Sequence, residues 1–221
     1  MVVAPKQASD ARDLAMSFGA TVVDDPGLGM AAAINAGLAV SAGETYYSWL
    51  GDDDAYIPGG LDRLVALLDA SPRAAVAYGA CEYVNESRDV VWTSRAGALA
   101  KWMLGIGPNL IPHPAALIRM DALMSVGGYR EDLRFVMDLD LFLRLKKKGP
   151  FVSSKHAVSR FGWHPDSLTV QNRKSSAEEA RLVKRSHLAR WIRPLEPLWE
   201  YPVQWATGLA ARSLNRRGRV R

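Results

Sequence analysis

The chain has 221 residues, of which 48% are apolar and 23% are charged. This composition excludes a disordered chain and is typical of a globular protein with one main domain. The single cysteine, Cys81, excludes an internal disulfide and a cysteine-rich metal site. The first residues lack the apolar stretch of a signal peptide and no apolar run is long enough to span a membrane, so we expect a cytoplasmic protein.

Strand-like and helical patterns alternate in the first eighty residues. The strand-like runs lie at residues 1–4, 20–23, 45–50 and 74–78, and the helical patterns lie at residues 10–18, 30–41 and after Pro58. This alternation is typical of βαβ units. We therefore expect an α/β fold with a mostly parallel sheet flanked by helices.

The patterns that follow are more mixed. Strand-like runs are expected at residues 81–84, 90–93, 115–118 and 151–161, and helices at residues 96–104, 120–126, 135–148, 173–191 and 195–214. We expect residues 1–172 to form the main domain and residues 173–221 to form a helical tail.

Three acidic residues follow the apolar run that ends at Leu50. Adjacent carboxylates repel one another and lose hydration when they are buried, so they rarely stabilise a strand end. Carboxylate oxygens are the ligands that Mg²⁺ and Mn²⁺ prefer, and ligands of open α/β sheets bind at the carboxyl ends of strands. We expect Asp54 to bind a divalent metal and Asp53 to contact a ribose or a metal-bound water. The alternative is a solvated turn.

A second candidate is the helix start between Gly27 and Gly37, which is rich in small residues. Small residues allow close approach of a ligand, and a helix N-terminus favours anions. Gly29 and Asn35 are therefore candidate ligand-binding residues. The alternative is a helix packed tightly on a sheet, with Asn35 capping a neighbouring loop.

A third candidate is Asp138, which shares one face of its helix with Leu141, Phe142 and Leu145. A carboxylate beside such apolar side chains suggests a function, and partial burial would give it the raised pKa of a general base. The alternative is an N-terminal cap. Asp140 has a simpler interpretation, because an arginine four residues later can pair with it.

Two histidines precede prolines, at His113 and His164. A neutral imidazole can bind a metal or donate to a phosphate. The alternative for both is a structural or surface position.

Taken in order, these motifs resemble glycosyltransferase family 2, whose members have the GT-A fold. The resemblance covers about residues 1 to 170 and rests on several motifs. These are the small-residue helix, the Asp-Asp-x-x-x-Pro-Gly segment, His113, Arg119, Gly127-Gly128-Tyr129, the helix that starts near Asp138, and His164-Pro165-Asp166-Ser167.

The resemblance implies an inverting sugar transferase that uses a nucleotide-sugar donor, a sugar or lipid-linked acceptor and Mg²⁺ or Mn²⁺. It implies that the pair Asp53 and Asp54 binds ribose and metal and that Asp138 deprotonates the acceptor; we expect His164 to be a further metal ligand. The implied donor-binding residues are Asp53, Asn35, Gly29, Arg119 and His113.

Compared with the family pattern, we expect the chain to start at the second strand, without the first βα unit, to which the resemblance assigns binding of the nucleotide base. Three functions are therefore compared: a transferase for cell-surface polysaccharide or glycolipid, an inactive relative that acts as a binding module, and another metal-dependent nucleotidyltransferase.

The end of the chain is basic. Residues 1–180 hold 18 basic and 21 acidic residues, whereas residues 181–221 hold 10 basic and 2 acidic residues. Arginines and tryptophans alternate in this tail, which suits an anionic membrane surface and a peripheral location at the inner face of the plasma membrane. The alternative is a helix pair that covers the sheet. The main domain offers no basic groove, so we expect no nucleic-acid partner.

Overall fold

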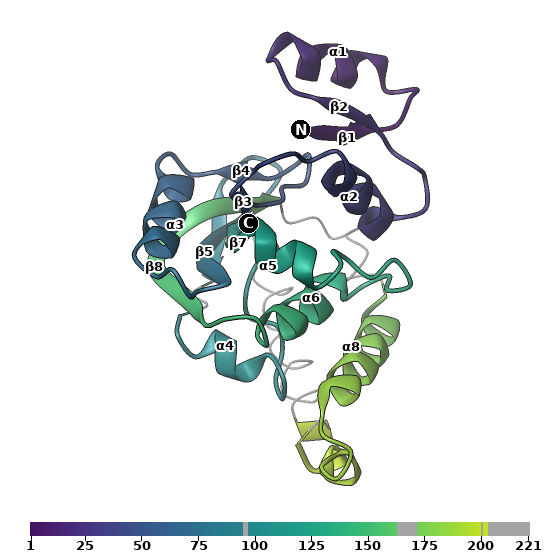
Figure 1. Cartoon of the computed structure of the whole chain (residues 1–221), viewed down its shortest axis with the longest axis vertical. Helices are drawn as coiled ribbons and strands as arrows, with labels where there is room; N and C mark the ends of the chain where they lie inside the picture. The colour runs from purple at the N-terminus through teal and green to yellow at the C-terminus, as the bar shows by residue number, and fades with distance from the viewer. Residues whose placement is uncertain (95–96, 163–171, 200, 203–221) are drawn as a thin grey trace.

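The computed structural model describes residues 1–94, 97–162, 172–199 and 201–202 (Figure 1). The first elements in chain order are β1 (Val2–Ala4), α1 (Ser9–Ser17), β2 (Val22–Asp24), α2 (Met30–Ala39), β3 (Tyr46–Tyr47), β4 (Ala55–Tyr56), α3 (Gly60–Asp69), β5 (Val76–Val84) and β6 (Val90–Ser94). They are followed by α4 (Ala100–Met103), η1 (His113–Ala115), β7 (Ala116–Arg119), α5 (Met120–Ser125), α6 (Met137–Leu145), β8 (Phe151–Gly162), α8 (Arg173–His187) and η2 (Arg193–Leu195).

The central sheet has six strands, in the order β3-β7-β5-β8-β4 with β6 paired to β5. The α/β class with flanking helices is confirmed, but the strand directions differ from the prediction. Within this sheet only β5 and β8 run parallel, and the other pairs are antiparallel. The reason lies partly in a short hairpin that joins β5 to β6, because a connection of that length permits only antiparallel pairing.

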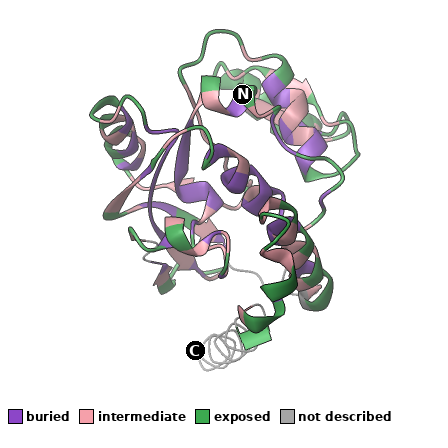
Figure 2. Ribbon diagram, turned by 60° about the horizontal axis from the view of Figure 1, so that its bottom comes forward, coloured by how far each residue is buried: buried purple, intermediate pink, exposed green. Residues whose placement is uncertain are grey.

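Helices cover both faces of the central sheet, with α3 on one side and α5 and α6 on the other (Figure 1). Successive side chains of β5 point to opposite faces of the sheet, as in any β-strand. Tyr78 packs in the cluster that contains Phe142 of α6, whereas Ala77 packs with Leu64 of α3. The residues coloured as buried lie mainly in the central strands and in the helices beside them (Figure 2).

The first two strands form a parallel sheet of their own, which does not pair with the central sheet among the described residues. Helix α1 packs on this unit and has no buried residue. Helix α2 connects the two parts: its Ile34 and Leu38 belong to the large core cluster, and Gly37 faces Val3. A Cβ at Gly37 would lie 3.0 Å from the Val3 side chain, so this contact requires a small residue.

The C-terminal region begins with α8, which confirms a helix near residues 173–191. The predicted helix at residues 195–214 and most of the basic tail lie outside the described residues. No helix in the described part of the chain is long and apolar enough to cross a membrane.

Candidate active site

The acid triplet lies in the loop between β3 and β4, and it is folded against the end of β8. Strand β4 pairs antiparallel with β8, which brings Gly162 opposite the triplet. The Asp54 carboxylate accepts hydrogen bonds from the backbone N–H of Gly51 and of Gly162, both at 3.1 Å. Burial raises the pKa of Asp54, and the charges of Asp53 and Asp52 raise it further. A bound cation would relieve both effects, so this position suits a metal ligand.

Asp53 contacts the same end of β8. A Cβ built on Gly162 would lie 2.6 Å from an Asp53 carboxylate oxygen, which leaves no room for a side chain. The backbone carbonyl of Asp53 accepts a hydrogen bond from Nη1 of Arg88 at 3.2 Å. Gly162 therefore leaves the space that the Asp53 side chain occupies, although the two residues are more than a hundred positions apart in the sequence.

Replacing Gly162 with Ala is expected to displace the Asp53 carboxylate. The clash involves the end of a side chain that can rotate, so the free energy of unfolding should change by less than about 1 kcal/mol. Binding of nucleotide and metal should weaken by about tenfold, measured by calorimetry. The matched control is Gly105→Ala, because a Cβ at Gly105 meets no atom within 4 Å. Unchanged binding in Gly162→Ala would contradict the assignment of Asp53.

Asp138 lies in the first turn of α6, and both oxygens of its carboxylate accept hydrogen bonds. One oxygen accepts the backbone N–H of Leu139 at 2.8 Å, and the other accepts Nδ2 of Asn109 at 2.8 Å. Burial raises the pKa of Asp138, although these hydrogen bonds oppose the rise. The residue nevertheless keeps some solvent exposure. Each carboxylate oxygen has a second lone pair, so Asp138 can still accept a proton.

Tyr83 is a partly buried aromatic residue near the end of β5. It packs against Trp92 and Phe161, with ring centroids 4.9 and 5.3 Å away. Burial raises the pKa of Tyr83, and the charges of both Asp138 and Asp54 contribute to the rise. Tyr83 therefore belongs to an aromatic group near the end of β5. Local patterns mark this residue only as an aromatic position in a strand.

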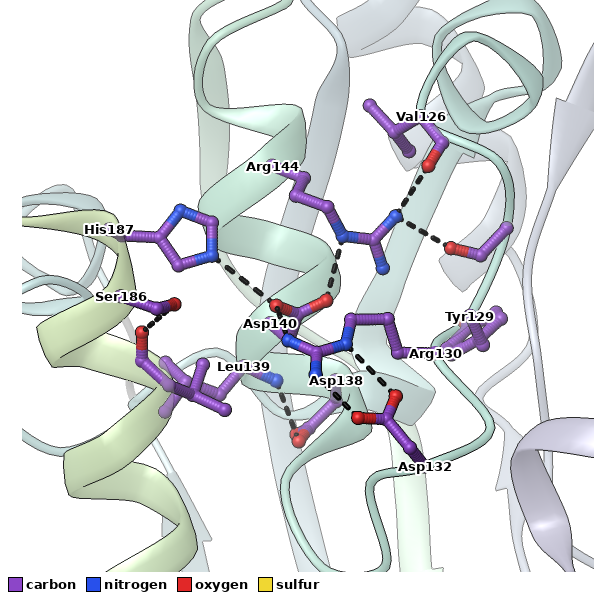
Figure 3. Close-up of polar contacts among 12 residues, drawn as sticks. Val126, Tyr129, Arg130, Asp132, Asp138, Leu139, Asp140, Arg144, Ser186 and His187 are labelled. Carbon is purple, nitrogen blue, oxygen red and sulfur yellow. Dashed lines mark hydrogen bonds and ion pairs between the residues drawn. The ribbon is translucent and has the colours of Figure 1, made fainter.

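A buried ion cluster supports the helix that carries Asp138 (Figure 3). Asp140 is 1% exposed and accepts Nε of Arg144 at 2.7 Å, which confirms the predicted pairing. Nε2 of His187 lies at 3.3 Å and an Arg130 nitrogen at 3.6 Å from the other oxygen. Burial alone would raise the pKa of Asp140, but the contacts with His187 and Arg144 hold it below its ordinary value.

Glu179 of α8 binds the backbone just before α6. Its carboxylate accepts the N–H groups of Arg134, Phe135 and Val136 at 2.9, 2.7 and 3.0 Å. These N–H groups precede the first helical residue, where a helix has no internal acceptors and favours negative charge. Glu179 therefore caps the segment that leads to Asp138. Sequence patterns missed it because the contact spans 43 to 45 residues.

Replacing Glu179 with Ala is expected to reduce the free energy of unfolding by about 1–3 kcal/mol, because three N–H groups lose their acceptor. Chemical denaturation at neutral pH measures this change. The matched control is Glu178→Ala, since Glu178 is the exposed neighbour on the same helix. Equal stability of the two variants would show that the cap contributes nothing.

Two predicted donor-binding residues lie at α2. Asn35 donates to the carbonyl of Tyr129 and to Glu131, and it accepts the N–H of Tyr129. It therefore fixes the segment after Gly128, in agreement with the alternative that it caps a neighbouring loop. Gly29 has a φ of 105°, which favours glycine, and precedes the first residue of α2.

Gly29 lines a cavity of about 460 Å³. The cavity lies between the start of α2 and the segment before α6, and Arg134 and Met137 contribute to its wall. Its wall reaches the first residue of α6, Met137, but does not include Asp138. Of the predicted donor-binding residues, Gly29 is the one that lines this cavity.

Arg119 and His113 have structural contacts in place of the predicted donor contacts. The Arg119 guanidinium donates to the carbonyl of Leu68, near the end of α3, at 2.7 Å and to the carbonyl of Ala74, in the segment before β5, at 2.9 Å. His113 is 7% exposed, stacks on Trp49 at 5.0 Å and contacts the Tyr129 hydroxyl at 2.6 Å. Carbonyl acceptors and a packed core explain both side chains, so we do not assign either to the donor.

Burial lowers the pKa of His113 to about 4. The folded state therefore resists protonation, and stability should be lost as the pH falls from about 6.5 towards 4. Between pH 7 and pH 5 we expect His113 to account for about 2 kcal/mol of lost stability. Comparing urea denaturation of wild type and His113→Gln at both pH values measures this share. His156→Gln is the matched control because His156 is exposed. A wild-type pH dependence retained in His113→Gln would contradict the assignment.

His164 lies outside the described residues, two positions after Gly162. No group of three or more His, Cys, Asp or Glu side chains in the described ranges is arranged to hold a metal ion. Asp53 and Asp54 supply hard oxygen donors of the kind that suits Mg²⁺ or Mn²⁺, and their role as ligands stays a prediction.

Known proteins share parts of this sequence and its fold. The sequence profile described as glycosyl transferase family 2 matches residues 5–127, more than half of the chain. An uncharacterized protein, y4gI of Sinorhizobium fredii, is 31% identical over 174 residues. That match covers 73% of this chain and 18% of y4gI, so the chain spans less than a fifth of this relative.

Two solved structures share the fold. TarS of S. aureus (residues 1–349) is similar with a TM-score of 0.59 and 14% identity, over 88% of this chain and 58% of that one. The mannosyltransferase PcManGT of Pyrobaculum calidifontis, in complex with GDP-Man and Mn²⁺, has a TM-score of 0.54 and 18% identity. That match covers 93% of this chain and 62% of PcManGT. The chain therefore has the fold of GT-A glycosyltransferases.

Proposed function

Since the chain belongs to glycosyl transferase family 2, we propose that it transfers a sugar from a nucleotide-diphosphate sugar to a hydroxyl acceptor, with inversion at the sugar carbon. One observation carries the proposal. Asp54 and Asp138 lie 84 positions apart in the sequence, and each is a half-buried carboxylate held by two hydrogen bonds, from Gly51 and Gly162 on Asp54 and from Leu139 and Asn109 on Asp138. An acidic pair for the donor and a separate acid for the acceptor are the two parts that this reaction needs.

The donor half of the site is the acid triplet. Asp54, with Asp53 beside it and His164 two residues beyond Gly162, would hold Mg²⁺ or Mn²⁺. The metal, when bound, neutralises the negative charge of the diphosphate leaving group. PcManGT, whose structure contains GDP-Man and Mn²⁺, supports a nucleotide-sugar donor and a divalent metal for this fold. Gly29, on the cavity at the start of α2, is the candidate for a close contact with the donor.

The acceptor half of the site is Asp138. The hydrogen bonds from Asn109 and Leu139 fix its carboxylate, and its partial exposure leaves it accessible. A raised pKa brings a carboxylate closer to the strength that a general base needs near neutral pH. Asp138 accepts the proton of the acceptor hydroxyl while that oxygen attacks the sugar. Attack from the side opposite the leaving diphosphate inverts the configuration.

The proposed reaction belongs to the synthesis of a cell-surface or extracellular polysaccharide or glycolipid, with a sugar or a lipid-linked sugar as acceptor. A second candidate, a non-catalytic binding module, is favoured by the separate β1–β2 sheet, where α1 has no buried residue. Such a unit is a weaker support for a nucleotide base than a continuous sheet. A nucleotidyltransferase would share the acidic pair but would not need Asp138.

The test is release of UDP or GDP from a panel of UDP- and GDP-sugars in the presence of Mn²⁺, with and without added sugar acceptors. We expect release from one donor class that requires both metal and acceptor. Nucleotide binding without release from any donor would favour the binding module. Pyrophosphate release from a nucleoside triphosphate would favour the nucleotidyltransferase.

A further inference from the structure

An exposed apolar face lies on α4 and the loop that follows it. Leu99, Trp102 and Ile106 are 64%, 66% and 48% exposed, and their spacing of three and four residues places them on one side. On the opposite side, Ala100 and Leu104 are fully buried in the large core cluster. The segment is thus anchored by its buried side and presents large apolar side chains outward.

Cationic side chains surround this face. The ammonium groups of Lys101 and Lys146 lie 6.0 and 5.9 Å from the centre of the Trp102 ring. Lys147 and Lys148 follow at the exposed end of α6. The sequence has no acidic residue between Asp89 and Asp121, so no local carboxylate from this stretch neutralises these lysines.

We propose that this face, formed by Leu99, Trp102, Ile106, Lys101 and Lys146, docks on the surface of an anionic lipid bilayer. Large exposed apolar groups usually mark a surface that binds a partner. Tryptophan places its ring at the level of lipid headgroups, and lysine keeps its charge in water while its stem lies along an apolar surface. Each lysine near an anionic membrane strengthens binding by about fivefold. Because lysines flank Trp102, a negatively charged bilayer complements this face better than an uncharged apolar partner would.

The docking face is connected to the candidate base. Asn109 follows Ile106 by three residues, and its side chain donates to Asp138 at 2.8 Å. A bilayer bound at Trp102 would thus lie next to the segment that holds Asp138. This consequence rests on the proposed function: an acceptor anchored in the bilayer would present its hydroxyl group on the side of the base. The docking itself does not depend on that function.

The test is co-sedimentation of the full chain with vesicles of phosphatidylcholine alone and with vesicles that contain equal parts of phosphatidylcholine and phosphatidylglycerol. We expect binding to the anionic vesicles that is at least about fivefold stronger than to the neutral ones. Trp102→Ser should weaken it about tenfold, and Lys146→Gln about fivefold. The matched control is Phe18→Ser at the end of α1, which is 83% exposed and should bind as wild type does.

Binding of Trp102→Ser and Lys146→Gln at the wild-type level would overturn the proposal, as would equal binding to both kinds of vesicle. Both side chains are exposed, so circular dichroism should show folded variants; if Trp102→Ser does not fold, Lys146→Gln alone decides. Nucleotide binding is measured separately by calorimetry. Vesicle binding through this face without any nucleotide binding would count against the proposed function and leave the docking face intact.

Discussion

Replacing Asp138 with Asn will reduce the rate of sugar transfer by about 10²- to 10⁴-fold while leaving donor binding close to wild type. An amide keeps the size of the side chain and can still accept the N–H of Leu139, but it cannot accept a proton from the acceptor. Steady-state transfer rates and calorimetric titration with UDP or GDP and Mn²⁺ measure the two effects.

The matched control is Asp121→Asn. Asp121 lies in the first turn of α5 and accepts the N–H of the next residue at 2.6 Å, as Asp138 does in α6, but it is exposed. It should retain full activity. An Asp138→Asn variant with wild-type transfer rates would exclude Asp138 as the base.

The same assignment predicts a pH dependence. Burial raises the pKa of Asp138, so the transfer rate should fall on the acidic side at a pH above the ordinary value for aspartate. The rate falls as the pH decreases, because the protonated carboxyl is no longer a base.

Replacing Asp54 with Asn will weaken metal-dependent nucleotide binding by about 100-fold, since a carboxylate ligand is lost. Stability should change little or increase slightly, because a buried charge next to two other acids is removed. Calorimetric titration in the presence and absence of Mn²⁺ measures the loss. The matched control is Asp52→Asn, because Asp52 belongs to the same triplet but is exposed. Equal losses in both variants would indicate a general charge effect in place of a specific ligand.

Short-range patterns predicted the parts of the site that depend on neighbours in the sequence. The pair of Asp140 and Arg144 follows from a spacing of four on one helix. The positions of the acid triplet after a strand and of Asp138 in a first helical turn also follow from local periodicity, although their roles remain proposals. The helix that holds Asp138 is thus a local consequence of its own sequence.

Long-range contacts were not predictable in this way. Asn109 binds Asp138 across 29 residues, and Gly162 binds Asp54 across 108 residues. The same limit explains Arg119 and His113, whose residue types suit a phosphate site. Arg119 bonds to carbonyls and His113 packs on an aromatic ring, and these partners come from distant parts of the chain. Only the folded structure shows these contacts. The predicted strand directions were wrong for a related reason. The position of β7 between β3 and β5 is a property of the whole sheet and not of any local pattern.

The most direct test of the account compares Mn²⁺-dependent binding of UDP and GDP in wild type, Asp54→Asn and Asp138→Asn. We predict that wild type and Asp138→Asn bind one of the two nucleotides with similar affinity, and that Asp54→Asn does not. Binding that needs no metal, or that is unaffected by Asp54→Asn, would contradict the division of the site into a metal and donor half at Asp54 and an acceptor half at Asp138.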